Sequence, residues 1–399
     1  MTGSMRRRAP LIVVFLKHKL ISCDVIVPVM LELRTASPAT QVRFVAPDRD
    51  TAEVIRRNVV LADAIDAVGQ LAALPEPRGP GRRALVAHRM RMAWWSVPLV
   101  VGCLLGRVTL VHFGALNRRP LRWLVGLSRR ATFLCQGALW SGTEVSNAAS
   151  HLRSPKAVER HAPVGDALVA FQPDWPLLAD PAFAAAPRYV FGSSRARKHW
   201  LDWVDDRAPR YLSSLTEHGI EPGDPILVYI LSFLGELPHM RSPASMIELL
   251  HDTIDVLLAE GDGAGVVLKP HAITDMAVVR AAVDARRGSP IAISHLHPQV
   301  LATRASLVVA SSWSTTFVDF TDTDIPTIEF TDYSDAALAL TDGGSLEPQH
   351  LTHFVNRDRE AFGVLVRELA TAPVERRRPT GEVGDPSGLL GALARGEAT

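Results

Sequence analysis

Short apolar runs separated by helix-length intervals recur through the first half of the chain. Leu11–Leu16 is continuously apolar, which is typical of a strand buried on both faces of a parallel sheet, and Gln41–Ala46 is a second strand candidate after a helical interval. Further short strands are expected at Val108–Phe113, Ala131–Cys135 and Tyr189–Phe191. The pattern is irregular between residues 61 and 91, where the composition of residues 75–83 predicts a loop.

The second half alternates strand and helix more regularly. The predicted strands are Pro225–Ser232, Gly265–Leu268, Ile291–Ser294, Leu307–Ala310 and Thr327–Phe330, and the predicted helices are Ser245–Glu260, Asp275–Arg287, Pro298–Arg304 and Ser314–Thr321. Strands that alternate with helices predict right-handed βαβ units and an open, doubly wound parallel sheet. The sequence therefore predicts an α/β protein.

Length and punctuation together predict two domains. A chain of 399 residues is long enough for two domains that each bury a core. Glu221-Pro-Gly-Asp-Pro225 precedes the regular half, so the boundary is expected near residue 220. The predicted organisation is an N-terminal domain at 1–220, a C-terminal domain at 221–375 and a flexible tail at 376–399, within which Leu389–Ala394 has the apolar content of a last helical turn.

The composition is that of a globular protein with an uneven distribution of charge. Hydrophobic residues make up 47% of the chain and charged residues 21%, which excludes a disordered protein and a multi-span membrane protein. Residues 1–220 contain 30 Lys and Arg against 17 Asp and Glu, whereas residues 221–399 contain 13 against 25. A basic half attracts an anionic partner such as phospholipid head groups, a phosphorylated acceptor or nucleic acid.

Three segments of the basic half bear on membrane contact. Leu11–Leu16 follows three arginines as in a signal peptide, but Lys17 ends the apolar run too early. Trp94–Val111 contains Arg107 and is expected to be a buried helix that leads into a strand. Asn117–Arg130 sets apolar residues among arginines, which suits an interfacial helix on anionic lipid or, alternatively, an ordinary amphipathic helix with a solvated basic face. The three cysteines have no metal-type spacing, which favours a reducing cytoplasm.

The chemistry of the second half is expected at the carboxyl ends of its strands. Ligands of open parallel sheets bind there, where the loops meet helix N-termini. These loops are rich in hydroxyl, imidazole and ammonium groups, at Ser232–Pro238, Lys269–His271, His295–Pro298, Ser311–Thr316 and Thr331–Ser334.

Residues 311–316 give the strongest signal for a phosphate site. Ser311, Ser312, Ser314 and Thr315 lie where a strand gives way to a helix, whose unpaired N–H groups bind phosphate. A simple N-cap is the alternative, but it requires only one hydroxyl. Lys269 and His271 would add an ammonium and an imidazole able to neutralise a diphosphate or to protonate a leaving phosphate.

An ordered set of motifs within residues 225–335 resembles a known family. Lys269-Pro-His271, Ser311-Ser312, Phe317-Val-Asp-Phe320 and Ile325-Pro-Thr-Ile-Glu-Phe330 follow one another as in the donor domain of the CDP-glycerol glycerophosphotransferases. They are also similar to the His-Pro and Ser-Ser motifs of bacterial sialyl-, polysialyl- and Kdo-transferases. Two departures are Ala272, where a proline is expected, and Val309-Ala310, which replace Asp-Tyr before the serine pair.

The resemblance implies the GT-B architecture, in which two Rossmann-like domains face across a cleft. It also implies that His271, Ser311, Ser312 and Ser314 hold the phosphates of a cytidine-type donor, although the His-Pro pair itself, His297-Pro298, comes one strand later and makes His297 the alternative imidazole. The other donor-binding candidates are Ser232, Gly235, Lys269, Thr315 and Glu329, and Glu329, like the loop acid Glu236, would accept a hydrogen bond from a ribose hydroxyl. No metal is expected, because no Asp-x-Asp motif follows a strand; Asp322 and Asp324 form that pattern at a helix end opposite the site.

The first domain is expected to bind the acceptor and to supply a base. His18 follows the first predicted strand and His112 ends another, so either imidazole is placed to deprotonate an acceptor hydroxyl. Alternatively, His18 belongs to a lysine-rich loop and His112 is a core histidine. Asp24 and Glu32 are reserve candidates on the following helical stretch.

These observations favour a metal-independent glycosyltransferase or polyol-phosphate transferase that uses a nucleotide-activated donor and no further cofactor. Its acceptor would be a growing bacterial surface polysaccharide or a lipid-linked glycan, at an anionic membrane surface on the cytoplasmic side. A nucleotide-sugar epimerase or hydrolase of the same fold is an alternative, although it leaves the basic half unexplained. A non-catalytic nucleotide-binding or nucleic-acid-binding protein is disfavoured, because the basic residues lack interleaved aromatic residues. A P-loop and a GxGxxG after the first strand are both missing from the sequence, which disfavours ATPase and NAD-dependent chemistry.

Overall fold

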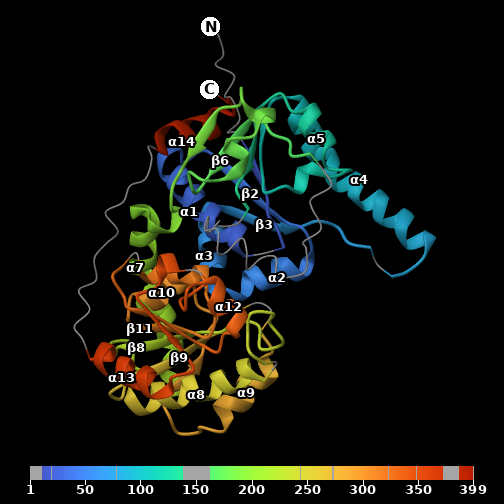
Figure 1. Ribbon diagram of the computed structural model, residues 1–399. Helices are drawn as coiled ribbons and strands as arrows, with labels where there is room; N and C mark the ends of the chain where they lie inside the picture. The colour runs from blue at the N-terminus through green and yellow to red at the C-terminus, as the bar shows by residue number, and fades with distance from the viewer. Residues whose placement is uncertain are drawn as a thin grey trace. The chain divides into compact units, whose positions relative to one another are not determined.

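The computed structural model describes residues 11–18, 20–77, 79–137, 162–242, 244–271, 274–321, 323–346, 348–371 and 386–398. Some expectations stated above fall outside the described residues. They concern residues 1–10, Ala272, Asp322 and residues 376–385. Figure 1 shows the chain as a ribbon.

The chain divides into two compact units. The described residues up to 200, together with residues 386–398, form unit 1, and the described residues between 201 and 371 form unit 2.

The division between the units falls before the expected boundary near residue 220. Helix α7 (Lys198–Leu212) passes from one unit to the other, and the 3-10 helix η5 (Ser213–His218) contacts strand β10 (Ile291–Ile293) of unit 2. The Glu221–Pro225 turn therefore precedes the first strand of unit 2, but the boundary between the two units lies earlier in the chain.

Unit 1 is built on a sheet of parallel strands in the order β3-β2-β1-β4-β5-β6-β7. The strands are β1 (Leu11–Phe15), β2 (Gln41–Ala46), β3 (Gly69–Ala73), β4 (Val108–His112), β5 (Thr132–Cys135), β6 (Ala167–Ala170) and β7 (Arg188–Val190). In the centre, Val13 of β1 pairs with Arg43 on one side and Leu110 on the other. Because β1 and β4 are nearly fully buried, their apolar runs form the core, as the sequence predicts.

Helices cover the sheet of unit 1. They are α1 (Ile21–Ala36), α2 (Arg49–Arg57), α3 (Val59–Val68), α4 (Arg82–Leu104), α5 (Trp123–Leu127) and α14 (Pro386–Arg395), with the 3-10 helices η1 (Ala115–Asn117), η2 (Pro176–Leu178), η3 (Pro181–Phe183) and η4 (Ser194–Ala196). Within the segment expected to be a flexible tail, α14 packs on α1 and buries Leu389, Leu390 and Leu393. Apolar burial therefore orders this part of the tail.

The expectation of a buried helix within Trp94–Val111 is wrong. The sequence between Trp94 and Leu104 is helical and leads into β4 as expected, but within α4 only Leu99 and Cys103 are buried. The N-terminal part of α4 projects from unit 1 (Figure 1), and the other side chains of the helix are partly or fully exposed. The Asn117–Arg130 stretch is not one amphipathic helix either, because only the short α5 forms within its second half.

Unit 2 repeats the same topology with a sheet of parallel strands in the order β10-β9-β8-β11-β12-β13. The remaining strands are β8 (Ile226–Ile230), β9 (Gly265–Lys269), β11 (Ala305–Ala310), β12 (Thr327–Thr331) and β13 (His353–Asn356). The helices are α8 (Ser245–Glu260), α9 (Met276–Asp284), α10 (Pro298–Ala302), α11 (Val318–Thr321), α12 (Asp335–Leu340) and α13 (Arg359–Ala370), with the 3-10 helices η6 (Thr315–Phe317) and η7 (Pro348–His350). Helices α8 and α13 pack together on the sheet, and Phe362 of α13 stacks on Phe330 of β12 with ring centroids 4.2 Å apart.

Candidate functional site

Both sheets place their chemistry by the same rule. In each unit the first strand along the chain lies between the second and the fourth strand. The order in which the chain adds strands to the sheet therefore reverses between β1 and β4 in unit 1 and between β8 and β11 in unit 2. Ligands of doubly wound sheets bind beyond the carboxyl ends of the strands at this switch point. The loops after these four strands are therefore the first places to look for functional side chains.

In unit 1 the switch point presents a histidine paired with an aspartate. His18 follows β1, and its Nδ1 lies 2.8 Å from Oδ2 of Asp48, which follows the neighbouring strand β2. The other carboxylate oxygen of Asp48 accepts a hydrogen bond from the backbone N–H of Thr51, so Asp48 is also the N-cap of α2. Partial burial alone would raise the pKa of Asp48, but the hydrogen bonds from Thr51 and the nearby His18 outweigh it and lower that pKa.

The His18–Asp48 pair has the geometry of an oriented base. The His18 side chain is 74% exposed and that of Asp48 only 26%, so the carboxylate is fixed and the imidazole is accessible. Since Nδ1 faces Asp48, Nε2 lies on the opposite side of the ring. A carboxylate that holds one ring nitrogen fixes the tautomer and leaves the other nitrogen able to accept a proton.

Lys17 places a cationic group at the same edge of the sheet. A Cβ built on Gly137, which follows β5, would lie 2.3 Å from the Lys17 ammonium, so the ammonium rests against the glycine backbone. The charge of Lys17 also contributes to lowering the pKa of His112. The unit 1 switch point is therefore positively charged beside the His18–Asp48 pair.

His112 is buried and held by the backbone on both sides. Its Nδ1 accepts a hydrogen bond from the N–H of Gly114, and its Nε2 donates to the carbonyl oxygen of Val164 at 2.9 Å. Burial is the main reason that the pKa of His112 falls from 6.5 to about 4. A neutral ring with both nitrogens engaged fits a structural histidine better than a base, so the geometry favours His18 over His112.

Glu32, a reserve candidate for the base, is held in a buried ion pair. Arg197 donates to both of its carboxylate oxygens, from Nε at 2.7 Å and from Nη2 at 3.1 Å. Less than a tenth of either side chain is exposed, and the guanidinium also stacks 4.5 Å from the ring centroid of Phe191. The ion pair joins α1 to the segment after β7 and leaves no carboxylate oxygen facing solvent.

In unit 2 the two serines predicted to bind phosphate are buried beneath a loop. The hydroxyl groups of Ser311 and Tyr229 share a hydrogen bond, and Oγ of Ser312 lies 3.2 Å from Nε2 of His239. Burial raises the pKa of Tyr229 to about 12, although its hydrogen bonds with Ser311 and Thr253 act in the opposite direction. The two serine hydroxyls therefore already have protein partners.

His239, which the sequence analysis missed, comes from the loop after β8. This loop crosses the end of β11 and pairs with the loop after β12, because the N–H of Ser334 donates to the carbonyl oxygen of His239 and Met240 bridges to Tyr333. The rings of His239 and Tyr333 meet edge-on at 5.5 Å. Only the long-range pairing of two loops brings His239 to Ser312, so no local sequence pattern indicates it.

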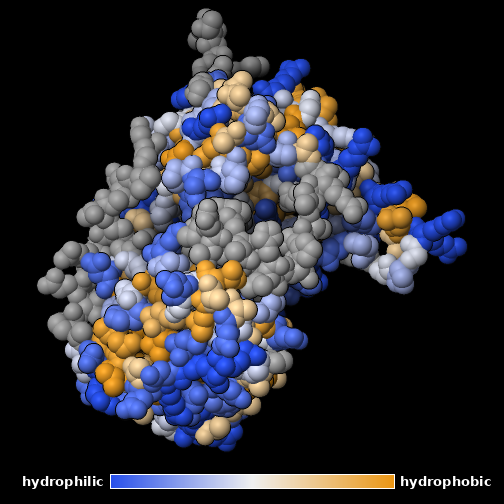
Figure 2. Space-filling view, in the orientation of Figure 1, coloured by the Kyte–Doolittle hydropathy of each residue, from blue (hydrophilic) through white to orange (hydrophobic). Residues whose placement is uncertain are grey.

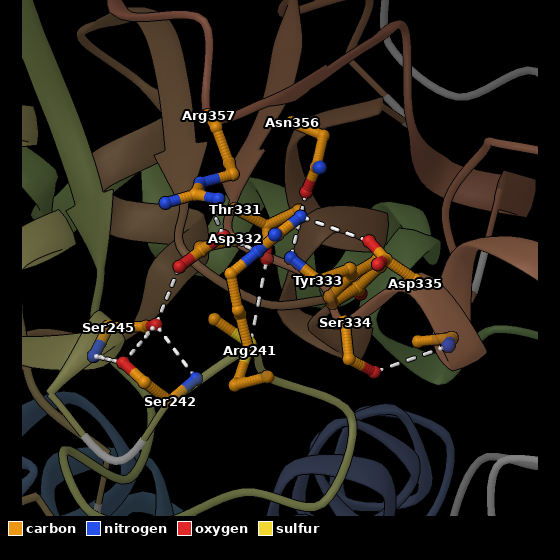
Figure 3. A network of polar contacts seen from close by, with 12 residues as sticks. Arg241, Ser242, Ser245, Thr331, Asp332, Tyr333, Ser334, Asp335, Asn356 and Arg357 are labelled. Atoms are coloured by element: carbon orange, nitrogen blue, oxygen red, sulfur yellow. Dashed lines mark hydrogen bonds and ion pairs between the residues drawn. The ribbon is translucent and has the colours of Figure 1, made fainter.

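Asp332 holds the loop after β8 in place (Figure 3). Its carboxylate forms ion pairs with Arg357, whose Nε lies 2.8 Å away, and with Arg241, whose Nε lies 3.3 Å away, and it accepts a hydrogen bond from the hydroxyl of Ser245 at 2.6 Å. The side chain of Asp332 is 9% exposed, whereas both arginines are partly open to solvent. One buried carboxylate therefore joins the loop after β8, the start of α8 and the end of β13.

Glu329, the candidate for ribose binding, is also engaged within the protein. It is fully buried in the middle of β12, and the hydroxyl of Tyr333 donates to its Oε1. Burial, together with the charge of Glu329, raises the pKa of Tyr333 well above its usual value. In this arrangement the carboxylate bonds Tyr333 rather than facing solvent.

His271 and Ser232 lie in loops that the structure joins. The N–H of His271 donates to the hydroxyl of Thr274, which in turn donates to the carbonyl oxygen of Ser232. His271 is exposed and Lys269 is partly exposed, at the end of β9. Since β9 and β11 lie on either side of β8, the ends of these strands are about 10 Å apart. In the loop after β8, a Cβ on Gly235 would clash with the ring of Phe233.

Of the remaining donor-binding candidates, one histidine is buried and two hydroxyl residues are partly exposed. His297 is fully buried, and its Nδ1 accepts from the N–H of Gln299 as the N-cap of α10. Ser314 caps η6 by accepting from the N–H of Thr316, and Ser314 and Thr315 are partly exposed. The accessible candidate side chains of unit 2 are therefore Lys269, His271, Ser314, Thr315 and the loop acid Glu236.

Other features of the described residues lie away from these loops. A cavity of about 580 Å³ in unit 2 is lined by residues 217–219, 283, 284 and 286–291, at the amino end of β10 and so at the opposite end of the sheet. No group of three His, Cys, Asp or Glu side chains suited to a metal ion occurs among the residues that the structure describes. Within the same residues, none of the helices combines the length and the apolar character needed to cross a bilayer.

The same architecture occurs in solved structures. They include UDP-N-acetylglucosamine 2-epimerase from Rickettsia bellii, with 10% identity, a TM-score of 0.52 and coverage of 97% of this chain and 94% of that one. A UGT transferase from Siraitia grosvenorii in complex with UDP has 10% identity, a TM-score of 0.50 and coverage of 96% and 98%. LpCGTa in complex with UDP has 11% identity, a TM-score of 0.50 and coverage of 98% and 100%.

No protein-family model and no curated protein sequence matches the chain. The likeness to the solved structures shows the fold, which is the GT-B type with two Rossmann-like units. The α/β expectation and the pair of doubly wound sheets are thereby confirmed.

Proposed function

We propose that the chain is a glycosyltransferase that takes its sugar from a nucleotide-activated donor and uses His18 as its base. The observation that carries the proposal is the His18–Asp48 pair at the switch point of unit 1, with a fixed carboxylate and an accessible imidazole. The GT-B fold supports it, since the solved structures with this fold include two that hold UDP.

The proposed reaction is a displacement at the anomeric carbon of the donor sugar. Nε2 of His18 takes the proton of an acceptor hydroxyl, and the acceptor oxygen forms a bond to the anomeric carbon. The bond from that carbon to the donor phosphate oxygen breaks, and the nucleotide leaves with the electron pair. Asp48 stabilises the imidazolium that forms, as a carboxylate does when it orients a histidine base.

Unit 2 is proposed to bind the donor through its accessible side chains. Lys269 and His271 would neutralise the phosphates as the nucleotide leaves, and Ser314 and Thr315 would donate hydrogen bonds. A cytidine nucleotide, transfer of a polyol phosphate instead of a sugar, and a surface-glycan or lipid-linked acceptor on the cytoplasmic side are proposed from the motif resemblance. Independence of metal and of any cofactor beyond the donor belongs to the same proposal.

Single-turnover transfer from CMP-, CDP- and UDP-activated sugars tests the base. His18→Ala is expected to lower the single-turnover rate constant by about 10²–10⁴, the usual contribution of a general base, and Asp48→Asn to lower it less. His199→Ala is the matched control, because His199 is an exposed histidine of the same unit and lies outside the site. Full activity of His18→Ala would reject the assignment of the base, and unchanged rates in a chelator are expected if no metal takes part.

Calorimetric titration of CMP, CDP, UDP and GDP tests the donor site separately. His271→Ala is expected to weaken nucleotide binding by about 10- to 150-fold, since one hydrogen bond to a charged group contributes roughly 1.5–3 kcal/mol. The control is His295→Ala, an exposed histidine that follows the edge strand β10. Equal affinities of wild type and His271→Ala for every nucleotide would remove His271 from the donor site.

An epimerase or hydrolase is the second candidate, and the epimerase among the structures of this fold is the observation that favours it. The two reactions differ in their products. A transferase leaves the donor intact until an acceptor is added, whereas an epimerase or hydrolase consumes the donor alone. Analysis of the sugar products with and without acceptor therefore separates them.

A further inference from the structure

Helix α4 has apolar residues on two opposite faces. Its inner face, which includes Trp95, Leu99 and Cys103, packs on the core of unit 1, and the ring of Trp95 meets that of Phe15 edge-on at 6.4 Å. These contacts attach α4 to the sheet. The outer face of a helix attached in this way is normally polar.

The outer face of α4 is instead an exposed apolar row. Its members, which we call the α4 stripe, are Val86, Met90, Trp94, Val97, Val101 and Leu104. Because they recur at intervals of three and four residues, they lie on one side of the helix. Trp94 is 75% exposed, and α5, which contacts α4, adds Trp123 with 66% exposed. Contiguous exposed apolar surface of this kind marks an interaction site.

The stretch of sequence that contains the α4 stripe carries positive charge only. No Asp or Glu occurs between Glu76 and Glu144, whereas the same stretch contains 11 arginines. At about 100° per residue, Arg82 and Arg89 fall beside one edge of the stripe and Arg91 beside the other. Figure 2 shows apolar and strongly hydrophilic residues side by side on the projecting part of α4. The surface therefore combines an apolar centre with cationic flanks.

We propose that the α4 stripe docks on a membrane surface of anionic phospholipid, with α4 lying in the plane of the head groups. An apolar face with arginine flanks and an exposed tryptophan is the pattern of helices that lie in the interface of a bilayer. Lipid phosphates supply the negative charge that this stretch of the chain lacks. A second copy of the chain would instead bring two arginine-rich surfaces together, which like-charge repulsion disfavours. The inference does not depend on the transferase reaction.

Flotation of the full chain with phosphatidylcholine vesicles, with and without phosphatidylglycerol, tests the surface. Wild type is expected to float only with the anionic vesicles, and less so as the salt concentration rises. Two variants probe the two components: Trp94→Ser with Val97→Ser removes apolar area, and Arg82→Glu with Arg89→Glu reverses flanking charge. Each is expected to weaken partitioning by about tenfold or more.

Matched controls come from unit 2. Val364→Ser removes an exposed apolar side chain of α13, and Arg280→Glu reverses an exposed charge of α9; both are expected to bind vesicles as wild type does. All substituted side chains of α4 are exposed, so equal melting temperatures should confirm folding. The proposal is overturned if wild type ignores anionic vesicles, or if both α4 variants bind them unchanged. If wild type does not bind the vesicles and instead forms a dimer that Trp94→Ser separates, the α4 stripe is the contact with a second copy of the chain and the membrane proposal is overturned.

Discussion

Replacing Glu32 by leucine should destabilise unit 1 severely. The substitution removes both acceptors of the Arg197 guanidinium, which is 8% exposed and cannot turn to water without unpacking α1. Leaving one member of a buried ion pair unpaired costs about 3–5 kcal/mol. The contact between Arg197 and Phe191 stays in place, but at roughly 0.5–2 kcal/mol a cation–π contact does not compensate. In a unit of this size we expect a melting temperature about 10 °C lower.

Urea unfolding of four variants separates ion pairing from loss of packing. Glu53→Leu is the matched control, because Glu53 pairs with Arg49 on the exposed face of α2, and such surface pairs contribute only about 0.5 kcal/mol. Arg197→Met alone should leave Glu32 unpaired and cost a similar amount to Glu32→Leu. The double variant Glu32→Leu with Arg197→Met replaces the pair by apolar groups and should recover most of the loss. If Glu32→Leu costs no more than Glu53→Leu, or if the double variant is as unstable as the single ones, the reasoning is refuted.

Two further predictions concern unit 1. The pKa of His112 falls from 6.5 to about 4 on folding, so between these pH values the unfolded state binds a proton that the folded state does not. The contribution of neutral, buried His112 to stability is therefore complete only above pH 6.5. This contribution, about 3 kcal/mol, is lost as the pH falls from 6.5 towards 4, and urea unfolding of His112→Gln should show a flatter pH dependence in that window than wild type. Deleting residues 386–399 removes three leucines that α14 buries, each contributing roughly 1.5–3 kcal/mol, and should lower the free energy of unfolding by about 5 kcal/mol. Unchanged urea unfolding after the deletion would contradict the packing of α14 on α1.

The sequence predicts most strands of the two sheets and misses three of them. The bounds of β2 and α8 agree with the expectation, and β1 differs by one residue, because continuous apolar runs and an amphipathic repeat leave few alternatives. Strands β3, β6 and β13 were missed. Strands β3 and β13 lie at sheet edges and are only partly buried, so neither needs a continuous apolar run. Strand β6 lies inside the sheet and is buried, but its apolar run of four residues is too short to stand out in the sequence.

The α4 expectation failed for a related reason. Apolar content predicts burial only when the protein itself supplies the covering surface, and α4 has apolar residues on two faces but one sheet to pack against. In contrast, the position of His18 was predictable, because it directly follows a recognisable strand. Its partner Asp48 required the pairing of β1 with β2, although an Asp three residues before Thr51 at a helix start is a recognisable N-cap signal.

The two switch points show how one topology can present different chemistry. In unit 1 the loop after β1 is short, because α1 begins at Ile21, so His18 remains accessible and Asp48 holds it from the neighbouring strand. In unit 2 the loop after β8 is long enough to cross the end of β11, and it covers Ser312 with His239. Hydroxyl residues that look equally available in the sequence therefore differ in exposure: Ser311 and Ser312 are buried and bonded within the protein, while Ser314 and Thr315 are partly exposed. Loop length between strand and helix, more than residue type, decides which polar side chains of a doubly wound sheet are accessible to a ligand.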